Sequence, residues 1–305
     1  MEIDFIHPGK AFLPEISAYR KFFLLHQIDS EVIEVDSGKP RNGQIEWQFM
    51  GIDIAKPSPG KFLIHEYASS SIPPWRKFKN RLKKNLTIKP DYRIFLNEYV
   101  RAQFSFNDDV PFGFRDMGVN LPEFRTVHKL HKKYDFIYVG NVGAERQIDA
   151  MINSFTTGRM AARTLLILSR NYQSLKNKLG RFRNISFAGP VPPEDVRSYI
   201  IQSKFALNFI PDSEPYNAQT PSKFLEYAAA SVPIVSTSFK WMRNFQADFG
   251  GSYFYVRDDL SNFDWDQINA FTYAFPDLRA WSWEHQIRNS GVLAFISSKF
   301  PQFSF

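Results

Sequence analysis

The chain has 305 residues, of which 38 are basic and 31 acidic, so its formal net charge is +7; 44% of its residues are apolar. This apolar fraction excludes global disorder, and the length indicates two domains or one large one. The absence of cysteine excludes disulfide scaffolds, thiolate zinc sites and thiol catalysis. No run of about 18 apolar residues is present for a membrane-spanning helix, and the N-terminus lacks a signal-peptide pattern, so we expect a cytoplasmic protein.

The first part of the chain alternates strand-like and helix-like runs. Ile3–Ile6 is typical of a buried strand that ends at His7-Pro8-Gly9, and a helix is expected from about Pro14. Further strands are predicted at Ser30–Asp36, Trp47–Ile52, Lys61–His65 and Tyr92–Asn97.

A strongly basic helix is predicted after Pro73-Pro74, in a stretch without acidic residues between Glu66 and Asp91. Its apolar side chains share one face, and they are Trp75, Phe78, Leu82 and Leu86. The cations that we expect to face a membrane beside Trp75 are Arg76, Lys77, Lys79, Arg81, Lys83 and Lys84. A basic helix with an apolar face suits an anionic membrane surface. The alternative is that the apolar stripe packs on its own sheet. Nucleic acid is a third partner class, but no aromatic-rich binding motif supports it, so none is predicted.

From Tyr134 onward the alternation of strands and helices becomes regular. Strands are predicted at Tyr134–Gly140, Thr164–Ser169, Asn184–Gly189, Phe205–Pro211, Pro233–Thr237 and Ser252–Arg257. Helices are predicted at about Arg146–Thr157, Pro193–Ser203, Ser222–Ser231, Trp241–Phe249 and Trp281–Phe300. This spacing favours a parallel sheet covered on both faces. We therefore predict two α/β domains, residues 1–125 and 126–278, followed by a C-terminal helix over residues 279–305.

The segment from Pro211 to Thr237 carries the strongest functional signal. A polar loop leads from one apolar strand into a helix that starts at about Thr220 or Pro221, and the free N–H groups at a helix start suit a phosphate. Lys223 in the first turn is unfavourable for the helix dipole unless an anion binds there. Glu226 can accept two hydrogen bonds from vicinal hydroxyls, as on a ribose. The alternative is an ordinary surface pair between these two side chains.

Three ordered segments of the second half resemble GT-B fold glycosyltransferases, especially family 4 and its relatives. The segment TPSKFLEYAAASVPIVST (220–237) looks like their donor-binding loop, helix and strand. YDFIYVGNVGAERQIDAMINSF (134–155) is similar to the opening of their C-terminal domain, and NISFAGPVPPEDVRSYI (184–200) to the strand, turn and helix that follow. Over the first 120 residues the resemblance rests on Ile3–Gly9 and IHEYASS. It implies two Rossmann-like, doubly wound domains facing a cleft, with the closing helix crossing back to the first domain.

The resemblance also implies roles for residues in the second domain. Glu226 would bind the ribose hydroxyls of a nucleotide-diphosphate sugar, and Lys223 and Arg146 would lie near its diphosphate. Glycines at two positions would let the backbone approach the donor, and loop side chains would offer hydrogen bonds. The glycines are Gly140 and Gly143, and the loop residues are Asn217, Thr220 and Ser222. For Arg146 the alternative is a solvated cation.

One departure from the family pattern concerns the donor sugar. Family 4 enzymes usually have two glutamates with seven residues between them, and the first falls on Ala218 here. Glu214 or Asp212 could replace the missing carboxylate, so the donor sugar and the stereochemical outcome stay open.

The first domain is expected to supply the acceptor side and the catalytic base. His65 and Glu66 close an apolar run, so we expect both to project from a strand end near the cleft as general base or hydrogen-bond donor. His7 and Gly9 end the first strand and could border the same cleft. The alternative for His65 is a histidine packed at a strand end, and the alternative for His7 and Gly9 is an ordinary turn.

Other chemistries fail on spacing, because the chain has no dinucleotide, phosphate-loop, nucleophile-elbow or H-E-x-x-H motif. The resemblance and the basic helix together give the leading hypothesis, a bacterial glycosyltransferase of hexosyltransferase type, independent of metal or cofactor and peripheral on the inner face of the cytoplasmic membrane. Its acceptor would be a lipid-linked or cell-surface polysaccharide, such as lipopolysaccharide. The alternatives are a sugar-nucleotide epimerase of GT-B architecture and a non-catalytic subunit that binds a membrane or a partner.

Overall fold

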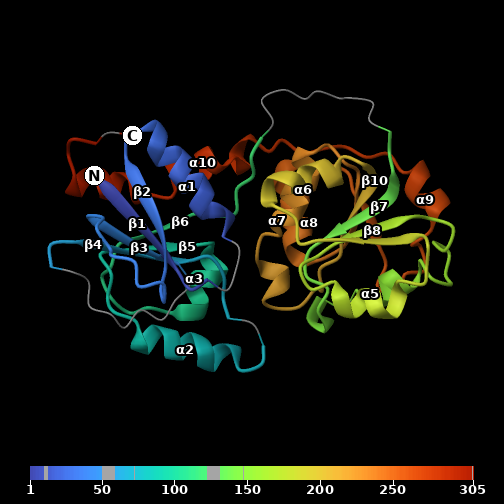
Figure 1. The fold of residues 1–305 in the computed structure, drawn as a ribbon, viewed down its shortest axis with the longest axis horizontal. Coiled ribbons are helices and arrows are strands. Elements are labelled where there is room, and N and C mark those ends of the chain that lie inside the picture. The colour runs from blue at the N-terminus through green and yellow to red at the C-terminus, as the bar shows by residue number, and fades with distance from the viewer. Residues whose placement is uncertain (10–12, 50–58, 72, 122–130, 147, 304) are drawn as a thin grey trace. The chain divides into compact units, whose positions relative to one another are not determined.

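The computed structural model describes residues 1–9, 13–49, 59–71, 73–121, 131–146, 148–303 and 305. The chain divides into two compact units (Figure 1). Unit 1 is Met1–Gly118 together with Ala280–Phe305, and unit 2 is Val119–Arg279. The divisions therefore fall after residues 118 and 279, whereas the sequence placed them after residues 125 and 278. The first predicted boundary lies outside the described residues.

Unit 1 is built on a six-stranded parallel sheet of order β2-β1-β3-β4-β5-β6. Its strands are β1 (Glu2–His7), β2 (Asp29–Glu34), β3 (Ile45–Phe49), β4 (Phe62–Tyr67), β5 (Tyr92–Phe95) and β6 (Phe112–Phe114). The order reverses between β1 and β3, because β2 pairs on one side of β1 and β3 on the other. Residues 50–52 of the predicted third strand lie outside the described residues.

One face of this sheet is covered by α1 (Pro14–Leu25), α10 (Trp283–Asn289) and α11 (Val292–Lys299). The core there joins both ends of unit 1, since Phe5 and Tyr19 pack in one cluster with Ile287 and Ile296. The predicted single helix over 281–300 is wrong. It breaks at Gly291, whose φ is +76°, and a Cβ at this position would lie 2.5 Å from the Tyr92 hydroxyl.

The opposite face of the sheet carries α2 (Arg76–Leu86) and α3 (Glu98–Phe104). Its smaller core includes Tyr67, Phe95 and Phe104. The sequence did not predict α3 or β6. The Asn97 side chain caps α3 by accepting a hydrogen bond from the Val100 backbone N–H at 3.0 Å.

Unit 2 has a second six-stranded parallel sheet, of order β12-β11-β10-β7-β8-β9. Its strands are β7 (Tyr134–Val139), β8 (Leu165–Leu168), β9 (Ile185–Ala188), β10 (Ser203–Asn208), β11 (Ile234–Thr237) and β12 (Phe254–Val256). All six were predicted from the sequence. Each is a short apolar run between turn residues, as expected for a sheet buried on both faces.

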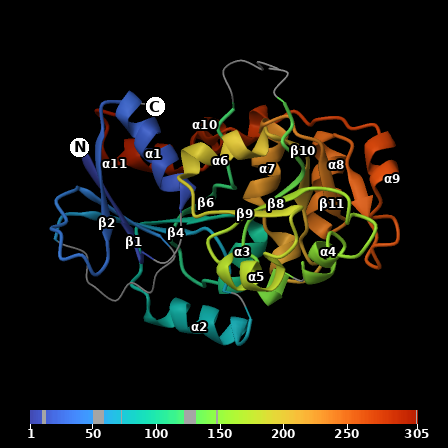
Figure 2. The ribbon, with the colours of Figure 1, turned by 45° about the vertical axis from the view of Figure 1, so that its right-hand side comes forward.

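Helices cover both faces of the unit 2 sheet (Figure 2). They are α4 (Asp149–Asn153), α5 (Gln173–Leu179), α6 (Pro193–Ile200), α7 (Ser222–Ala229), α8 (Lys240–Phe249) and α9 (Trp265–Ala270). Side chains of α4, α5 and α9 share a core with Phe136 and Phe205 of the sheet. Asp264 caps α9 by accepting hydrogen bonds from the backbone N–H groups of Asp266 and Gln267, a position that favours an acidic residue. Helix α5 was not predicted from the sequence.

Candidate functional site

In unit 2 the strand order reverses between β7 and β10. The chain runs from β7 through β8 to β9 and then returns to pair β10 on the other side of β7. Ligands of doubly wound sheets bind at such a switch point, beyond the carboxyl ends of the strands. The loops there follow Val139 and Asn208. Together with α7, which follows the second loop, they carry the residues that the sequence assigned to the donor.

The two loops contact each other through short 3₁₀ turns. The first turn, Ala144–Arg146, follows β7, and the second, Tyr216–Ala218, follows β10. The guanidinium carbon of Arg146 lies 4.9 Å from the ring centroid of Tyr216, within the range of a cation–π contact. The structure therefore brings together the segments around Arg146 and Asn217, and it adds Tyr216, which the sequence had not singled out.

The glycines after β7 shape the first loop. Gly140 has a φ of +151°, and its N–H donates to the Leu168 carbonyl at 3.0 Å. The Gly143 N–H donates to Asn141 Oδ1 at 3.0 Å. Gly140 thus fits a backbone conformation that favours glycine.

Helix α7 is fixed to the switch point by Tyr227. Its hydroxyl oxygen accepts a hydrogen bond from the Val139 backbone N–H at 2.8 Å, and burial raises the pKa of this tyrosine well above its usual value. Pro221 precedes the helix, Ser222 is its first residue, and no side chain caps it. The N–H groups of the first turn are thereby left without a side-chain acceptor.

Lys223 and Glu226 form an ion pair in this helix. The Lys223 ammonium lies 2.5 Å from Glu226 Oε1, and both side chains are about one-third exposed, at 32% and 31%. This is the surface pair that the sequence left as an alternative. The same geometry holds a cation and a carboxylate within reach of solvent beside the start of α7. Their roles toward a donor stay predictions.

Two polar oxygens in the loop after β10 lack partners among the described residues. They are Oγ1 of Thr220, a residue that is 8% exposed, and Oδ1 of Asn217. The Asn217 amide nitrogen donates to Asp212 at 2.9 Å. Buried polar atoms are usually hydrogen-bonded, so a bound ligand that donates hydrogen bonds would explain both oxygens.

The carboxylates that could replace the one missing at Ala218 are in different situations. Asp212 accepts from the Lys240 backbone N–H at 3.1 Å and pairs with Arg243 at 3.2 Å. Although partial burial opposes it, these hydrogen bonds and that of Asn217 hold the pKa of Asp212 below its usual value. Asp212 is therefore engaged at the start of α8, whereas Glu214 is exposed.

In unit 1, His65 and Glu66 do not project from a strand end. Strand β4 continues through Tyr67, and the two residues are only 3% and 1% exposed. Glu66 is held by an ion pair with Arg115 and by the Trp47 indole N–H, which donates at 2.8 Å. The expected position is therefore wrong, because this carboxylate is a buried partner of an arginine. The catalytic role predicted for the two residues stays a prediction.

Sequence reasoning missed the buried cluster to which Glu66 belongs. Arg115 is fully buried, and its guanidinium also lies 3.4 Å from Glu15. Burial raises the pKa of Glu15 despite the opposing effect of Arg115. Burial works against the charge of Arg115, but Glu66, Tyr19 and Glu15 raise its pKa overall. The only local signal was an arginine in the aromatic run FGFRD.

His7 and Gly9 lie at the carboxyl end of β1. The His7 Nδ1 atom accepts from the Gly9 N–H at 3.1 Å, and Gly9 has a φ of +70°. This positive φ is a backbone conformation that favours glycine. The pair lies at the switch point of unit 1, and its role toward an acceptor is untested.

Helix α2 turns its apolar stripe outward. Trp75, just before the helix, is 77% exposed, and Phe78, Leu82 and Leu86 are 64%, 40% and 48% exposed. The buried residue is Asn80, whose side-chain oxygen accepts from the Ser71 N–H at 3.1 Å. The alternative in which the stripe packs on its own sheet is therefore wrong. Two of the cations expected to face a membrane instead bond to unit 1, because Arg76 donates to the Tyr99 hydroxyl of α3 and Lys84 to the Ser105 carbonyl after it. Whether the other cations of α2 face a membrane stays a prediction.

The described residues offer neither a metal-ion cluster nor a membrane-spanning helix. They contain no group of three or more His, Asp or Glu side chains placed to hold a metal ion. Within the same residues, no helix combines the length and apolarity needed to cross a bilayer. His128, one of two histidines in the basic boundary region, lies outside the described residues, and His131 is exposed.

Comparison with known proteins gives structural but not sequence relatives. No protein-family model and no curated protein matches the chain. AviGT4, a glycosyltransferase involved in avilamycin A biosynthesis, superposes with a TM-score of 0.59 at 11% identity over 99% of this chain and 96% of that one. T4 phage BGT in complex with UDP and Mn²⁺ gives 0.56 at 14% identity over 88% and 89%. The UDP-GlcNAc 2-epimerase of Methanocaldococcus jannaschii, bound to UDP-GlcNAc and UDP, gives 0.53 at 11% identity over 97% and 100%.

These likenesses confirm the predicted fold. The chain has the GT-B glycosyltransferase-like fold, with two Rossmann-like α/β units, each built on a six-stranded parallel sheet.

Proposed function

We propose that this chain is a glycosyltransferase that takes a sugar from a nucleotide-diphosphate donor held by unit 2. The contact between Arg146 and Tyr216 carries the proposal, because it joins the two loops at the switch point of the sheet. The fold supports it, since the AviGT4 and phage proteins are glycosyltransferases, and the phage protein was solved with UDP.

The site offers complementary chemistry for such a donor. We assign the ribose hydroxyls to Glu226 and the diphosphate to Arg146, Lys223 and the uncapped start of α7. The diphosphate is the leaving group, and its developing charge is stabilised by fixed cations and N–H donors. Thr220 Oγ1 and Asn217 Oδ1, which lack partners among the described residues, can accept from donor hydroxyls.

Donor binding can be tested by calorimetry with uridine and guanosine diphosphates. Glu226→Gln removes a charged acceptor, so we expect at least about tenfold weaker binding. Glu284→Gln is the matched control, because Glu284 also pairs with a helical cation, Arg288, at 3.0 Å. The proposal fails if no diphosphate binds saturably, or if Glu226→Gln behaves as the control does.

We further propose that the transferred sugar is a hexose and that transfer needs no metal ion or cofactor. Activity should then persist in excess EDTA. Loss of activity that Mn²⁺ restores would contradict this part of the proposal alone.

The acceptor that we propose is a lipid-linked or cell-surface polysaccharide, reached from the inner face of a bacterial cytoplasmic membrane. Support comes from α2, which exposes Trp75 and Phe78 beside a run of cations. Aromatic and aliphatic side chains enter the lipid interface, and each nearby cation adds about 1 kcal/mol on an anionic surface. An acceptor anchored in that surface would then be held beside unit 1.

A sugar-nucleotide epimerase is the second candidate. Ala218 stands where family 4 enzymes carry a glutamate, and the likeness to the archaeal epimerase spans almost the whole chain. Conversion of a donor without any acceptor would favour this alternative. Binding to vesicles without conversion or transfer would favour a non-catalytic subunit.

A further inference from the structure

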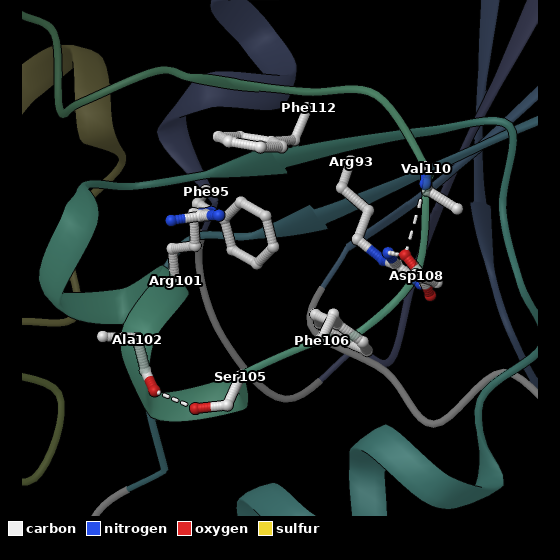
Figure 3. A pocket seen from close by; sticks show the side chains of 9 residues that line it. All are labelled: Arg93, Phe95, Arg101, Ala102, Ser105, Phe106, Asp108, Val110 and Phe112. Atoms are coloured by element: carbon white, nitrogen blue, oxygen red, sulfur yellow. Dashed lines mark hydrogen bonds and ion pairs between the residues drawn. The ribbon is translucent and has the colours of Figure 1, made fainter.

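Unit 1 contains a cavity of about 210 Å³ beside α3, at the β6 edge of its sheet (Figure 3). The side chains that line it include Arg93, Arg101, Ser105, Phe106, Asp108 and Phe112. Its volume is several times the roughly 30 Å³ of a water molecule. It is smaller than the about 300–1,000 Å³ of pockets that hold drug-sized ligands. The cavity therefore suits one small group and not a whole nucleotide sugar.

Arg93 lines the cavity with a buried guanidinium. Its side chain is 5% exposed, and its two Nη atoms bond to the Asp108 carboxylate at 2.5 and 2.8 Å. The guanidinium lies over the Phe106 ring at 3.8 Å. Its Nε has no hydrogen-bond partner among the described residues. An unpartnered buried N–H is uncommon in native proteins.

Arg101 gives the cavity a second, more accessible guanidinium. Its side chain is 42% exposed and lies 4.2 Å over the Phe112 ring, and one Nη donates to Glu98 at 3.3 Å. Figure 3 shows this guanidinium beside Phe95 and Phe112. Because a guanidinium carries five N–H groups, the bond to Glu98 leaves donors for a ligand.

The charges around the cavity favour an anion. Asp108 is matched by Arg93, whose hydrogen bonds lower the pKa of this carboxyl, so that it stays ionised. Arg101 and Lys84 then remain, opposed by Glu98, which is 69% exposed. The Lys84 ammonium donates to the Ser105 carbonyl and lies 5.9 Å from the Phe106 ring centroid.

We propose that this cavity binds a phosphate group. Arginine fits phosphate with paired, charge-assisted hydrogen bonds, and Arg101, which lines the cavity, keeps donors for them. Lys84 belongs to α2, so the cavity adjoins the helix that we propose to lie on a membrane. The phosphate can therefore come from a lipid headgroup or be free in solution. Only the first source rests on the proposed membrane contact.

The test uses the full chain and soluble phosphates at constant ionic strength. Inorganic phosphate and glycerol 3-phosphate should bind the wild type in calorimetry and raise its melting temperature. Arg101→Gln should weaken binding about tenfold, as expected for loss of charge-assisted hydrogen bonds. Arg288→Gln is the matched control, because Arg288 is 43% exposed, pairs with Glu284 in a helix and lies 5.2 Å over the Phe22 ring.

Vesicle binding separates the two sources. If a lipid supplies the phosphate, phosphatidylcholine vesicles with phosphatidate should bind the wild type about tenfold better than Arg101→Gln. If the two bind vesicles equally while soluble phosphate still distinguishes them, the ligand is free phosphate. The proposal is overturned if no phosphate distinguishes wild type from Arg101→Gln, with Lys84→Gln as a second variant should the first unfold. Nucleotide binding by unit 2 should be unchanged in both variants, so this result is independent of the donor site.

Discussion

The two units use charged side chains in opposite ways. In unit 2 the pair of Lys223 and Glu226 lies at the sheet's carboxyl edge, about one-third exposed. In unit 1, Glu66 and Arg115 form a pair with fully buried side chains, while α2 carries apolar side chains on its outer face. A cation paired with a carboxylate is therefore not by itself evidence of a ligand site. An accessible pair can contact a ligand, whereas a buried pair is closed to ligands and leaves an uncompensated charge in the core if one partner is removed.

The largest effect should come from the buried pair. Arg115→Met leaves Glu15 and Glu66 buried without their cation, so we expect the free energy of unfolding to fall by about 3–5 kcal/mol. Urea denaturation measures this loss. Arg279→Ala is the control, because Arg279 is 88% exposed in its pair with Asp277. A loss of less than about 1 kcal/mol would mean that this cluster does not stabilise unit 1.

The next largest effect should be on vesicle binding, when the exposed apolar stripe of α2 is changed. Phe78→Ser removes an aromatic side chain from the proposed lipid contact, so partitioning onto anionic vesicles should fall about tenfold. Sedimentation with vesicles measures it. Leu25→Ser provides the comparison, since Leu25 is also exposed but lies in α1. Equal losses for both variants would indicate that the basic helix has no special role.

The titration of Glu15 should contribute to the pH dependence of the free energy of unfolding. Burial raises the pKa of its folded form above the ordinary 4.5, so the folded state binds more protons than the unfolded state. The contribution of Glu15 is therefore fully present below pH 4.5 and is lost as the pH rises through the folded pKa. Urea denaturation across this range should show a smaller decline for Glu15→Gln than for wild type. Parallel curves for the two proteins would contradict the assignment.

The smallest effect on stability should come from the exposed pair of unit 2. Lys223→Met removes an i,i+3 ion pair worth about 0.2–0.5 kcal/mol, so the unfolding curve should barely move. Affinity for the nucleotide diphosphate should fall nonetheless. If the free energy of unfolding falls as much as in Arg115→Met, the pair of Lys223 and Glu226 is structural, and the two units do not differ in how they use paired charges.

The sheet of unit 2 could be predicted from the sequence because the patterns that indicate its strands are local. Each strand of unit 2 is an apolar run followed by turn residues, and the loops after β7 and β10 carry their polar groups in order. Parallel pairing then places these loops together. The contact of Arg146 with Tyr216 was missed because nothing near Tyr216 marks it as a partner.

The features missed in unit 1 depend on residues far apart in the chain. Glu66 is buried by Trp47 and Arg115, neither of which neighbours it in sequence. Strand β6 has three residues, and a Cβ at its Gly113 would lie 1.8 Å from the Ser290 carbonyl oxygen. Such short elements have no measurable periodicity, so only tertiary packing defines them.

Unit 1 contains segments from both ends of the chain, and this affects the order in which the two units fold during synthesis. Ile287 and Ile296 complete the core around Phe5 and Tyr19, so this core cannot close until the final helices leave the ribosome. Unit 2 is continuous and complete at Arg279, so it can fold first, against the usual N-terminal-first order. A nascent chain stalled so that Arg279 has just left the exit tunnel, with residues 280–305 still inside it, should therefore contain a protease-resistant unit 2 and a first segment that is still cleaved.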